Sequence, residues 1–218
     1  MNLSFPLILS APSGGGKTTI ARELLQRRGD LGYSVSATTR PRREGEVDGR
    51  DYHFLTRTAF LERVEQGDFA EWAEVHGNLY GTLRSEVKRL LSSGRHVVMD
   101  IDVQGAEQFR RAFPDSVLVF LLPPSASILA ARLAGRQTEG AEALRTRLTT
   151  AIRELEALPM YDYVVVNDDL EVAIARVSAI IEAEAARRTR ALDLAERIGR
   201  LRDELDGQLS ASTISRND

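Results

Sequence analysis

A short stretch near the N-terminus carries residue types that suit the binding of a triphosphate. It reads S-A-P-S-G-G-G-K-T-T from Ser10 to Thr19. Three adjacent glycines let the backbone approach a bound group without Cβ clashes, and their N–H groups, with those of a following helix, can surround an anion. Lys17 adds a positive charge for the β- and γ-phosphates, and the Thr18 hydroxyl can ligate Mg²⁺. The predicted triphosphate site comprises Ala11, Pro12, Ser13, Gly14, Gly15, Gly16, Lys17, Thr18 and Thr19.

This loop fits the pattern G-x-x-x-x-G-K-[ST] at every place except the first, which is Ala11. Alanine can replace glycine there if the residue needs no positive φ. The plain alternative is a flexible glycine turn with a solvated lysine. Because an apolar run precedes the loop at residues 7–10 and helical spacing follows it from Ile20 to Leu25, we favour the binding site.

A second candidate site residue closes the run H-V-V-M-D-I-D, which spans residues 96–102. This run predicts a buried strand that ends in two carboxylates, and ligands of open α/β sheets bind at the carboxyl ends of strands. Asp100 is therefore placed to hold Mg²⁺ beside the phosphate loop. The alternative is a structural carboxylate that caps the helix starting near Val103, and it suits Asp102 better than Asp100.

Two arginines in the basic run T-R-P-R-R-E could act on one phosphate. Arg40 and Arg43 are spaced so that both guanidinium groups can converge, and the guanidinium fork suits bidentate binding of phosphate oxygens. A basic loop that is only solvated is an equally good interpretation of this stretch taken alone.

The run F-A-E-W-A-E-V places a carboxylate on an apolar strand face. With a period of two, Glu71 shares a face with Phe69, Ala73 and Val75, which is costly unless the carboxylate has a partner. A guanine base is such a partner, because its N1–H and N2 amino group are adjacent donors, whereas adenine has an acceptor at N1. Tyr80 and Thr82 add a phenol and a hydroxyl nearby. The alternative is a different register in which Glu71 points to water.

An arginine-rich helical stretch is the last candidate. Arg132 and Arg136 are four residues apart and share one face of a helix, and Arg145 and Arg147 follow. Arginines on a closing lid can stabilise the charge of a phosphoryl group in transfer, each contributing on the order of 10³–10⁵ in rate. Solvated helix charges are the alternative, and we favour that alternative for Arg145.

Composition limits the classes of protein that these residues can belong to. The chain has 218 residues, of which 43% are hydrophobic, and a net charge of -3. This charge argues against a general nucleic-acid binder, and the lack of cysteine excludes disulfides and thiolate metal sites. No basic region precedes the first apolar run, and no apolar run reaches membrane-spanning length. We expect a cytoplasmic protein with no membrane contact.

The elements that must position the site residues alternate along the chain. Near-continuous apolar runs predict buried parallel strands at 7–10, 97–100, 117–122 and 164–167. Helical patterns follow them at 18–28, 103–112, 128–133 and 170–187. Alternation of this kind favours an α/β fold with a parallel sheet core and helices on both faces.

Two stretches interrupt this alternation, and a third follows it. We expect a core of residues 1–35, 84–124 and 161–187, with an insertion at 36–83 and an arginine-rich helical lid at 125–160. After residue 187, Leu194, Ile198, Leu201, Leu205 and Leu209 recur at spacings of three and four, which predicts an amphipathic helix. This helix can pack on the core or pair with another chain, giving a homo-oligomer. We expect residues 210–218 to be disordered.

Taken together, these motifs resemble those of the guanylate kinase family over roughly residues 4–186. The resemblance rests on S-A-P-S-G-G-G-K-T-T, S-V-S-A-T-T-R, G-E-V-D-G-R-D-Y, E-W-A-E-V-H-G-N-L-Y-G-T, D-I-D-V-Q-G and V-N-D-D. It implies a P-loop nucleoside-monophosphate-kinase fold with a GMP-binding insertion and a helical lid. It also implies transfer of the γ-phosphoryl group of ATP to GMP, with Mg²⁺. Pro41-Arg42 stands where Thr-Pro is familiar, but the spacing of Arg40 and Arg43 is kept.

The resemblance also implies a role for each candidate residue. Those expected to bind the GMP phosphate are Ser36, Arg40, Arg43, Tyr52 and Tyr80, and those near guanine are Glu71, Thr82 and Asp100. The expected ATP-binding residues are those of the phosphate loop and Asn167, which resembles a residue near the adenine. The expected catalytic residues are Lys17, Arg43, Arg132, Arg136 and Arg147, and the expected metal ligands are Thr18 and Asp100.

Two other functions compete with phosphoryl transfer to GMP. Guanylate-kinase-like domains of scaffolding proteins bind phosphopeptides without catalysis, but a degraded phosphate loop is expected there, whereas Lys17 and Thr18 are present here. A related P-loop kinase with a phosphorylated sugar as acceptor should lack the set of Glu71, Tyr80 and Thr82, which this chain contains.

Overall fold

The centre of the protein is a five-stranded parallel sheet in the order β2-β7-β1-β8-β9. The computed structural model describes residues 3–75, 77–134 and 141–214. The strands of this sheet are β1 (Pro6–Ser10), β2 (Leu31–Tyr33), β7 (His96–Asp100), β8 (Val117–Leu122) and β9 (Tyr163–Val166). Every residue of β1 is buried, because helices cover both faces of the sheet.

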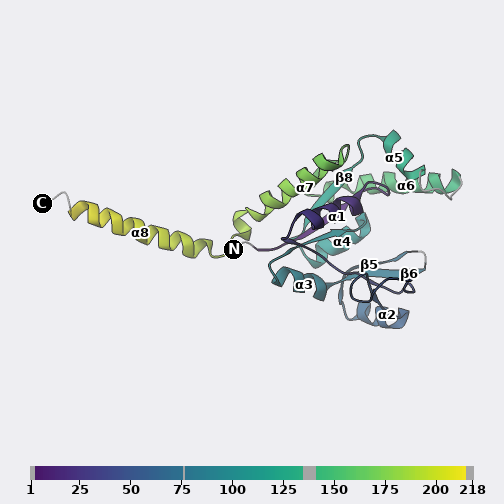
Figure 1. Ribbon diagram of the computed structural model, residues 1–218, viewed down its shortest axis with the longest axis horizontal. Coiled ribbons are helices and arrows are strands. Elements are labelled where there is room, and N and C mark those ends of the chain that lie inside the picture. The colour runs from purple at the N-terminus through teal and green to yellow at the C-terminus, as the bar shows by residue number, and fades with distance from the viewer. Residues whose placement is uncertain (1–2, 76, 135–140, 215–218) are drawn as a thin grey trace. The chain divides into compact units, whose positions relative to one another are not determined.

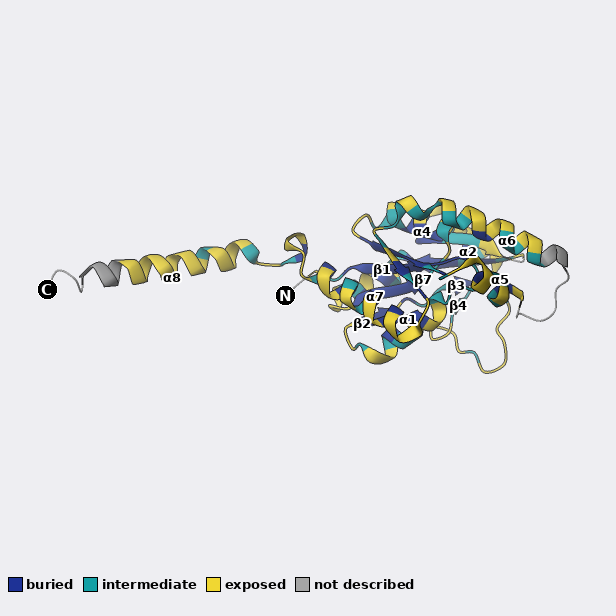
Figure 2. Cartoon of the chain, turned by 90° about the horizontal axis from the view of Figure 1, so that it is seen from above, coloured by how far each residue is buried: buried dark blue, intermediate teal, exposed yellow. Residues whose placement is uncertain are grey.

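These helices form a layer on each side of the sheet. Figure 2 shows α4 (Val103–Ala112) on one side and α1 (Lys17–Arg27) and α7 (Leu170–Ala185) on the other. A further helix, α3 (Arg84–Ser92), packs against β7. The predicted parallel sheet with helices on both faces is thus confirmed.

The four strands predicted for this sheet are present, and their ends differ from prediction by one residue at most. The fifth strand, β2, was missed. It has three residues, Leu31-Gly32-Tyr33, and only the first two are buried. So short a run, with a glycine in its middle, carries no periodic signal that separates a strand from a loop.

The order of the strands creates a crevice at the end of β1. The chain leaves β1 through α1 to reach β2, whereas it leaves β7 through α4 to reach β8 on the opposite side of β1. The connections therefore diverge at the carboxyl end of β1, where ligands bind in open α/β sheets. The phosphate loop and Asp100 both lie at this end of the sheet, because Leu9 of β1 is in register with Asp100 of β7.

The predicted insertion folds as a separate four-stranded sheet, seen at the lower right of Figure 1. Its order is β4-β3-β6-β5, formed by β3 (Ala37–Thr38), β4 (His53–Phe54), β5 (Phe69–Val75) and β6 (Asn78–Leu83). The helix α2 (Arg57–Glu65) belongs to this part, and Phe60 of α2 stacks on Phe69 of β5 with 4.3 Å between ring centroids. This part therefore has a small core of its own, made by Ala37, Phe60, Phe69, Leu79 and Leu83.

Where the structure describes it, the predicted lid forms the helices α5 (Ala126–Ala134) and α6 (Ala141–Glu156) and a 3-10 turn, η1 (Leu158–Met160). Leu129 and Leu133 of α5 pack with Ala151 of α6 in a buried cluster of their own. In Figure 1 these helices lie at the upper right, and the insertion sheet lies below them.

The chain forms two compact units, residues 4–181 and residues 1–3 with 182–218. The second unit contains η2 (Arg188–Arg190) and α8 (Leu194–Ile214). The predicted amphipathic helix is present, but the prediction of disorder from residue 210 is wrong for 210–214, which continue α8. No glycine or proline follows Gly207, so nothing in these residues stops a helix. Residues 215–218 lie outside the described part of the chain. No described helix is long and apolar enough to cross a membrane.

Candidate active site

The phosphate loop joins β1 to α1, and its shape requires each of its three glycines. Gly14 and Gly16 have φ angles of 79° and 91°, a region that side chains disfavour. A Cβ on Gly15 would lie 2.5 Å from the Cβ of Ala11 and 2.8 Å from the Pro12 carbonyl oxygen. Ala11 is buried and has no positive φ, so the departure from glycine at this place is accommodated as expected.

The N-terminus of α1 faces this loop with free hydrogen-bonding capacity. Gly16 precedes the first helical residue, Lys17, and among the described residues no side chain caps this end of the helix. The first N–H groups of a helix have no intrahelical acceptor, and the helix dipole places positive charge there. With the Lys17 ammonium group alongside, this end of α1 is suited to bind an anion.

Asn167, at the carboxyl end of β9, holds the phosphate loop in place. It follows β9 directly, its exposed fraction is 6%, and its side-chain amide Nδ2 donates a hydrogen bond of 2.8 Å to the Gly15 carbonyl oxygen. It also lines a pocket beside the loop, with Gly14, Gly16, Thr19, Arg132, Asp168 and Leu170. The residue that the sequence places near the ATP base therefore contacts the loop itself.

A hydroxyl and a carboxylate meet at the carboxyl end of the sheet. The Thr18 hydroxyl donates to Asp100 Oδ2 at 2.5 Å, and the Tyr33 hydroxyl donates to Asp100 Oδ1 at 3.2 Å. Sequence reasoning missed Tyr33, because β2, which presents it, was not recognised as a strand. The two predicted metal ligands, Thr18 and Asp100, thus lie in direct contact.

Oxygen atoms of this kind fit the preference of Mg²⁺, which takes hard oxygen ligands. No group of three or more His, Cys, Asp or Glu side chains that could hold a metal ion occurs among residues 3–75, 77–134 and 141–214. One hydroxyl and one carboxylate suit an ion that keeps most of its waters and binds phosphate oxygens as well.

A second pocket lies between the insertion sheet and the end of β7. Of the predicted site residues it brings together Ser36, Tyr52, Glu71, Tyr80 and Asp100. The remaining lining residues are Tyr33, Ala73, Val75, Gly81, Ile101 and Asp102. Because Asp100 lines this pocket and also accepts the hydrogen bond of Thr18, the second pocket meets the phosphate loop at this pair.

Glu71 presents a buried carboxylate to the second pocket. Its exposed fraction is 9%, and the Thr82 hydroxyl donates to its Oε1 at 2.6 Å. Burial raises the pKa of Glu71 to about 7, and the hydrogen bond from Thr82 opposes this shift in part. A Cβ added to Gly105 of α4 would lie 3.2 Å from Glu71 Oε2, so α4 approaches the carboxylate closely.

The predicted face of this strand needs one correction. Ala73 and Val75 line the same pocket as Glu71, but Phe69 belongs to the insertion core with Phe60. The pairing of β5 with β6 shifts register between Phe69 and Glu71, because a bulge inserts one residue there. The strict period of two therefore fails at this point, although Glu71 is buried as expected.

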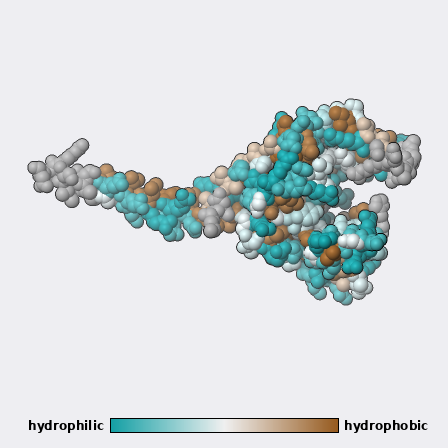
Figure 3. All heavy atoms as spheres, viewed as in Figure 1, coloured by the Kyte–Doolittle hydropathy of each residue, from teal (hydrophilic) through white to brown (hydrophobic). Residues whose placement is uncertain are grey.

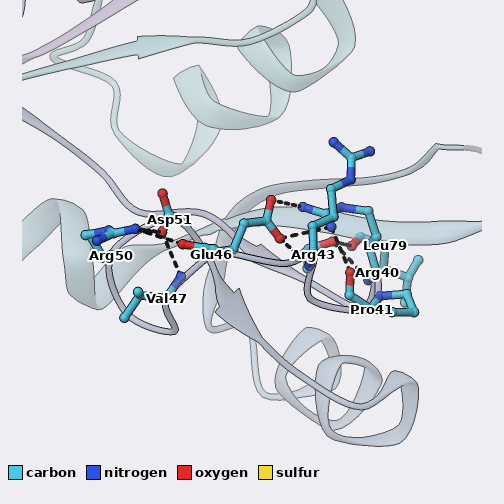
Figure 4. Close-up of polar contacts among 10 residues, drawn as sticks. Arg40, Pro41, Arg43, Glu46, Val47, Arg50, Asp51 and Leu79 are labelled. Carbon is cyan, nitrogen blue, oxygen red and sulfur yellow. Dashed lines mark hydrogen bonds and ion pairs between the residues drawn. The ribbon is translucent and has the colours of Figure 1, made fainter.

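The basic loop holds its two arginines in different ways. The Arg40 guanidinium donates to both carboxylate oxygens of Glu46, at 2.7 and 3.1 Å, and lies 5.4 Å from the centroid of the Tyr52 ring. The backbone N–H of Arg43 donates to Glu46 Oε2 at 2.8 Å, while its guanidinium points away from Glu46 (Figure 4). Glu46, which the sequence did not single out, thus organises this loop.

The lid contacts the phosphate loop through an unexpected carboxylate. Glu154 Oε2 on α6 accepts a hydrogen bond of 3.3 Å from the backbone N–H of Ser13. Burial raises the pKa of Glu154, and the Ser13 N–H and the Lys17 charge oppose this shift. The sequence of α6 did not predict this contact, because the helix has charged side chains on several faces and Glu154 does not stand out among them.

The two predicted lid arginines that the structure describes, Arg132 and Arg147, contact different carbonyl oxygens. Arg132 lies against the phosphate loop, and its guanidinium donates to the Asn167 carbonyl oxygen at 3.4 Å. Arg147 donates to the Leu133 carbonyl oxygen at 3.2 Å and so joins α6 to α5. Arg136 lies outside the described residues.

Comparison with known proteins places this geometry in a family. The family model described as guanylate kinase matches residues 4–184. The chain belongs to the guanylate kinase family. The guanylate kinase of Paramagnetospirillum magneticum is 50% identical over 197 residues, which cover 90% of this chain and 92% of that protein. The guanylate kinase of Rhodopseudomonas palustris is 48% identical over 200 residues, 91% of each chain.

A solved structure supports the same assignment of fold. The crystal structure of guanylate kinase from Anaplasma phagocytophilum matches with a TM-score of 0.70 and 34% sequence identity. The match covers 90% of this chain and 94% of that chain. The fold is therefore that of the guanylate kinases, as the sequence motifs predicted.

Proposed function

We propose that this chain is a guanylate kinase that transfers the γ-phosphoryl group of ATP to GMP, giving ADP and GDP. The observation that carries the proposal is the contact of Thr18, in the phosphate loop, with Asp100, which lines the second pocket. One pocket adjoins a phosphate loop, and the other contains the buried carboxylate of Glu71. Two nucleotides that met end to end at this contact would have their phosphates side by side.

The second nucleotide is proposed to be GMP because of the chemistry of Glu71. A buried carboxylate with one oxygen bonded to Thr82 has acceptor capacity left over. Guanine offers N1–H and N2–H as two adjacent donors, whereas adenine offers an acceptor at N1 and would leave the carboxylate unpaired. Sites built on buried polar pairing can reject such an analogue by roughly 10⁴–10⁵.

The remaining residues have roles that follow from their places. Ser36, Arg40, Arg43, Tyr52 and Tyr80 are proposed to bind the GMP phosphate. Thr82 is proposed to orient Glu71, and Asn167 to hold the phosphate loop under ATP. The Lys17 ammonium and the guanidinium groups of Arg43, Arg132, Arg136 and Arg147 are proposed to stabilise the phosphoryl group in transfer.

The proposed reaction needs no covalent enzyme intermediate. A phosphate oxygen of GMP attacks the γ-phosphorus of ATP directly, and the chain's work is to align the two groups and neutralise their charge. We propose that Thr18 and Asp100 hold Mg²⁺, which neutralises charge on the phosphate oxygens when bound. The loop N–H groups and Lys17 fix the donor, and the insertion fixes the acceptor.

The partners and location proposed for this chain follow from the same chemistry. ATP and GMP are the small-molecule partners, with neither nucleic acid nor a membrane as a ligand, and the cytoplasm supplies both nucleotides. We also propose that the chain forms a homo-oligomer through its C-terminal helix.

A coupled assay of ADP formation tests the function directly. Purified chain is mixed with ATP, Mg²⁺ and a panel of acceptors comprising GMP, AMP, CMP, UMP and a phosphorylated sugar. We expect turnover with GMP at least about 10³ times that with AMP. Turnover with the sugar phosphate instead would point to the related kinase. No turnover by a folded chain that still binds a phosphopeptide would point to a non-catalytic module.

A further inference from the structure

The helix α8 carries an exposed apolar stripe that phosphoryl transfer does not use. Ile198, Leu201, Leu205 and Leu209 have exposed fractions of 50%, 58%, 51% and 66%. Figure 3 shows hydrophobic atoms in a row along this helix, with hydrophilic atoms beside them. Water contact over such a row is unfavourable, at about 25 cal/mol for each Å² of apolar surface.

The spacing of the stripe is that of a two-stranded helical pair. Leu194, Ile198, Leu201 and Leu205 follow one another at intervals of four, three and four residues, which is the seam of a heptad repeat. Gly199 and Gly207 lie within the same helix and weaken it, and an isolated helix of this length is only marginally stable in water. A partner that buries the seam would stabilise α8.

The charges beside the seam indicate which partner fits. Residues 197–202 contain Arg197, Arg200 and Arg202, and residues 203–206 contain Asp203, Glu204 and Asp206. Glu196, which precedes the basic stretch, pairs with Arg200 at 3.1 Å. α8 therefore has a basic stretch at residues 197–202 that is followed by an acidic stretch at residues 203–206.

A second copy of α8 complements this distribution only if the two helices run in opposite directions. Positions 197 and 204 of the two copies then become neighbours on one side of the seam, and they are arginine and glutamate. In a parallel pair, by contrast, positions 197 and 202 of the two copies are neighbours across the seam, and both are arginine.

We infer that α8 pairs with α8 of a second copy of this chain in an antiparallel coiled coil. Ile198 of one copy lies against Leu201 of the other, Leu194 lies against Leu205, and Arg197 lies beside Glu204. This inference deepens the self-association proposed above and rests on it, but it does not rest on the phosphotransfer activity.

Light scattering of the full chain after size exclusion tests the pairing. The chain has a mass of 24.2 kDa, and we expect twice this value at high concentration. Leu201→Glu should restore the monomer mass, whereas the control Asp203→Asn, on the outer face of α8, should not. Both variants should keep phosphotransfer activity, which also reports that the core is folded. A monomeric full chain, or a dimer that survives Leu201→Glu, would overturn the inference.

The direction of the helices is tested separately with thiols, since the chain contains no cysteine. A mixture of Ile198→Cys and Leu201→Cys chains should give cross-linked heterodimers with a short thiol reagent. Each variant alone should cross-link poorly. Efficient cross-linking of each variant with itself would show parallel helices and would overturn the antiparallel arrangement while leaving self-association intact.

The pairing of charges has its own test in a charge swap. Arg197→Glu alone should weaken dimerisation about tenfold, because it places two acidic side chains side by side at both ends of the seam. The double variant Arg197→Glu, Glu204→Arg should regain the original dissociation constant. Failure of the second change to rescue the first would contradict the proposed register.

Discussion

The ionisation of Glu71 is the residue-scale property with the clearest consequence. Burial raises the pKa of Glu71 to about 7, so the carboxyl is part protonated at neutral pH when no base is bound. Guanine offers hydrogen-bond donors, and only the carboxylate can accept both of them. Binding of GMP should therefore select the charged form and release a proton from the protonated fraction.

This selection gives a pH dependence of the GMP interaction. We expect KM for GMP to rise about tenfold for each pH unit below about 7 and to level off above it, because the charged fraction changes in that way. Steady-state kinetics between about pH 5 and pH 8 measure the slope. The KM for ATP serves as the internal control, and a parallel change in both constants would contradict the assignment to Glu71.

The raised pKa of Glu71 also makes the stability of the folded chain depend on pH. The direction is opposite to that for GMP binding, because stability falls as pH rises. The pKa of Glu71 is raised from 4.5 in the unfolded chain to about 7, so the folded state holds the proton more tightly. The contribution of this group is therefore fully present below pH 4.5 and is lost as pH rises towards 7, by about 3 kcal/mol. Thermal melts of the nucleotide-free chain at increasing pH should show this loss of stability, and melts of the Glu71→Gln chain should not show it.

Substitution of Glu71 separates the recognition of GMP from that of ATP. We expect Glu71→Gln to lower kcat/KM for GMP about 10–100-fold, since a charged acceptor is replaced by a neutral one. The KM for ATP should change less than about twofold. Glu74 is the matched control, because it lies on the same strand but is exposed and pairs with Arg57 at 2.9 Å. Similar losses from Glu74→Gln would point to a general effect on β5.

Substitution of Lys17 tests the phosphate loop. Lys17→Ala should lower kcat about 10²–10³-fold, because it removes a positive charge from the proposed place of the transferred phosphoryl group. The melting temperature should change little, since Lys17 is only half-buried. The exposed Lys88 on α3 provides the control. A Lys17→Ala chain with a near-normal rate would refute the proposed role.

Much of the candidate site could be predicted from residue types in the sequence. The rest depends on tertiary contacts that the sequence does not show. Glu71 stood out because a carboxylate on an apolar strand is costly, which is a local property. Glu46, Glu154 and Tyr33 did not stand out, because a charged or phenolic side chain in a loop, helix or short strand is ordinary. Their contacts with Arg40, Ser13 and Asp100 exist only once distant segments meet.

At the scale of elements, the loop around Glu46 makes a distinct prediction. Its carboxylate joins the Arg40 guanidinium to the Arg43 backbone, with side-chain exposed fractions of 13% for Arg40 and 20% for Glu46. We expect Glu46→Gln to raise KM for GMP about three- to tenfold, because Arg40 loses the partner that fixes it over Tyr52. The value of kcat at saturating GMP should change less.

A neighbouring carboxylate provides the control for this loop. Glu44 is exposed and lies two residues before Glu46, so Glu44→Gln changes the net charge of the loop by the same amount. Equal effects of both substitutions on KM for GMP would show that the charge of the loop, and not the position of Arg40, is what matters.

Elements were predictable where burial on both faces made their pattern simple. The strands β1, β7 and β8 are apolar runs because they lie inside a parallel sheet, whereas β9 is an edge strand that is apolar although only Val165 is buried. The insertion strands were harder, since the bulge in β5 breaks the alternation and β3 and β4 have two residues each. A strand could therefore be predicted from the sequence where its apolar pattern was long and regular enough.

At the scale of residues 4–181, the two pockets belong to lobes that flank a groove. Figure 3 shows this hollow between the part that carries α5 and α6 and the part that carries the insertion sheet. ATP held on the phosphate loop therefore lies near water unless the groove closes. Closure should expel water, which would otherwise accept the phosphoryl group.

This arrangement predicts that hydrolysis of ATP is slow without an acceptor. We expect ADP formation in the absence of GMP to stay below about a thousandth of the rate with saturating GMP, since the donor alone aligns no nucleophile. Guanosine, which has the base but no phosphate, should compete with GMP for the pocket without raising hydrolysis, because Arg40 and Tyr80 then have no phosphate to bind. Strong ATP hydrolysis with guanosine would mean that filling the base pocket closes the groove, and that the phosphate-binding side chains of the insertion contribute little to closure.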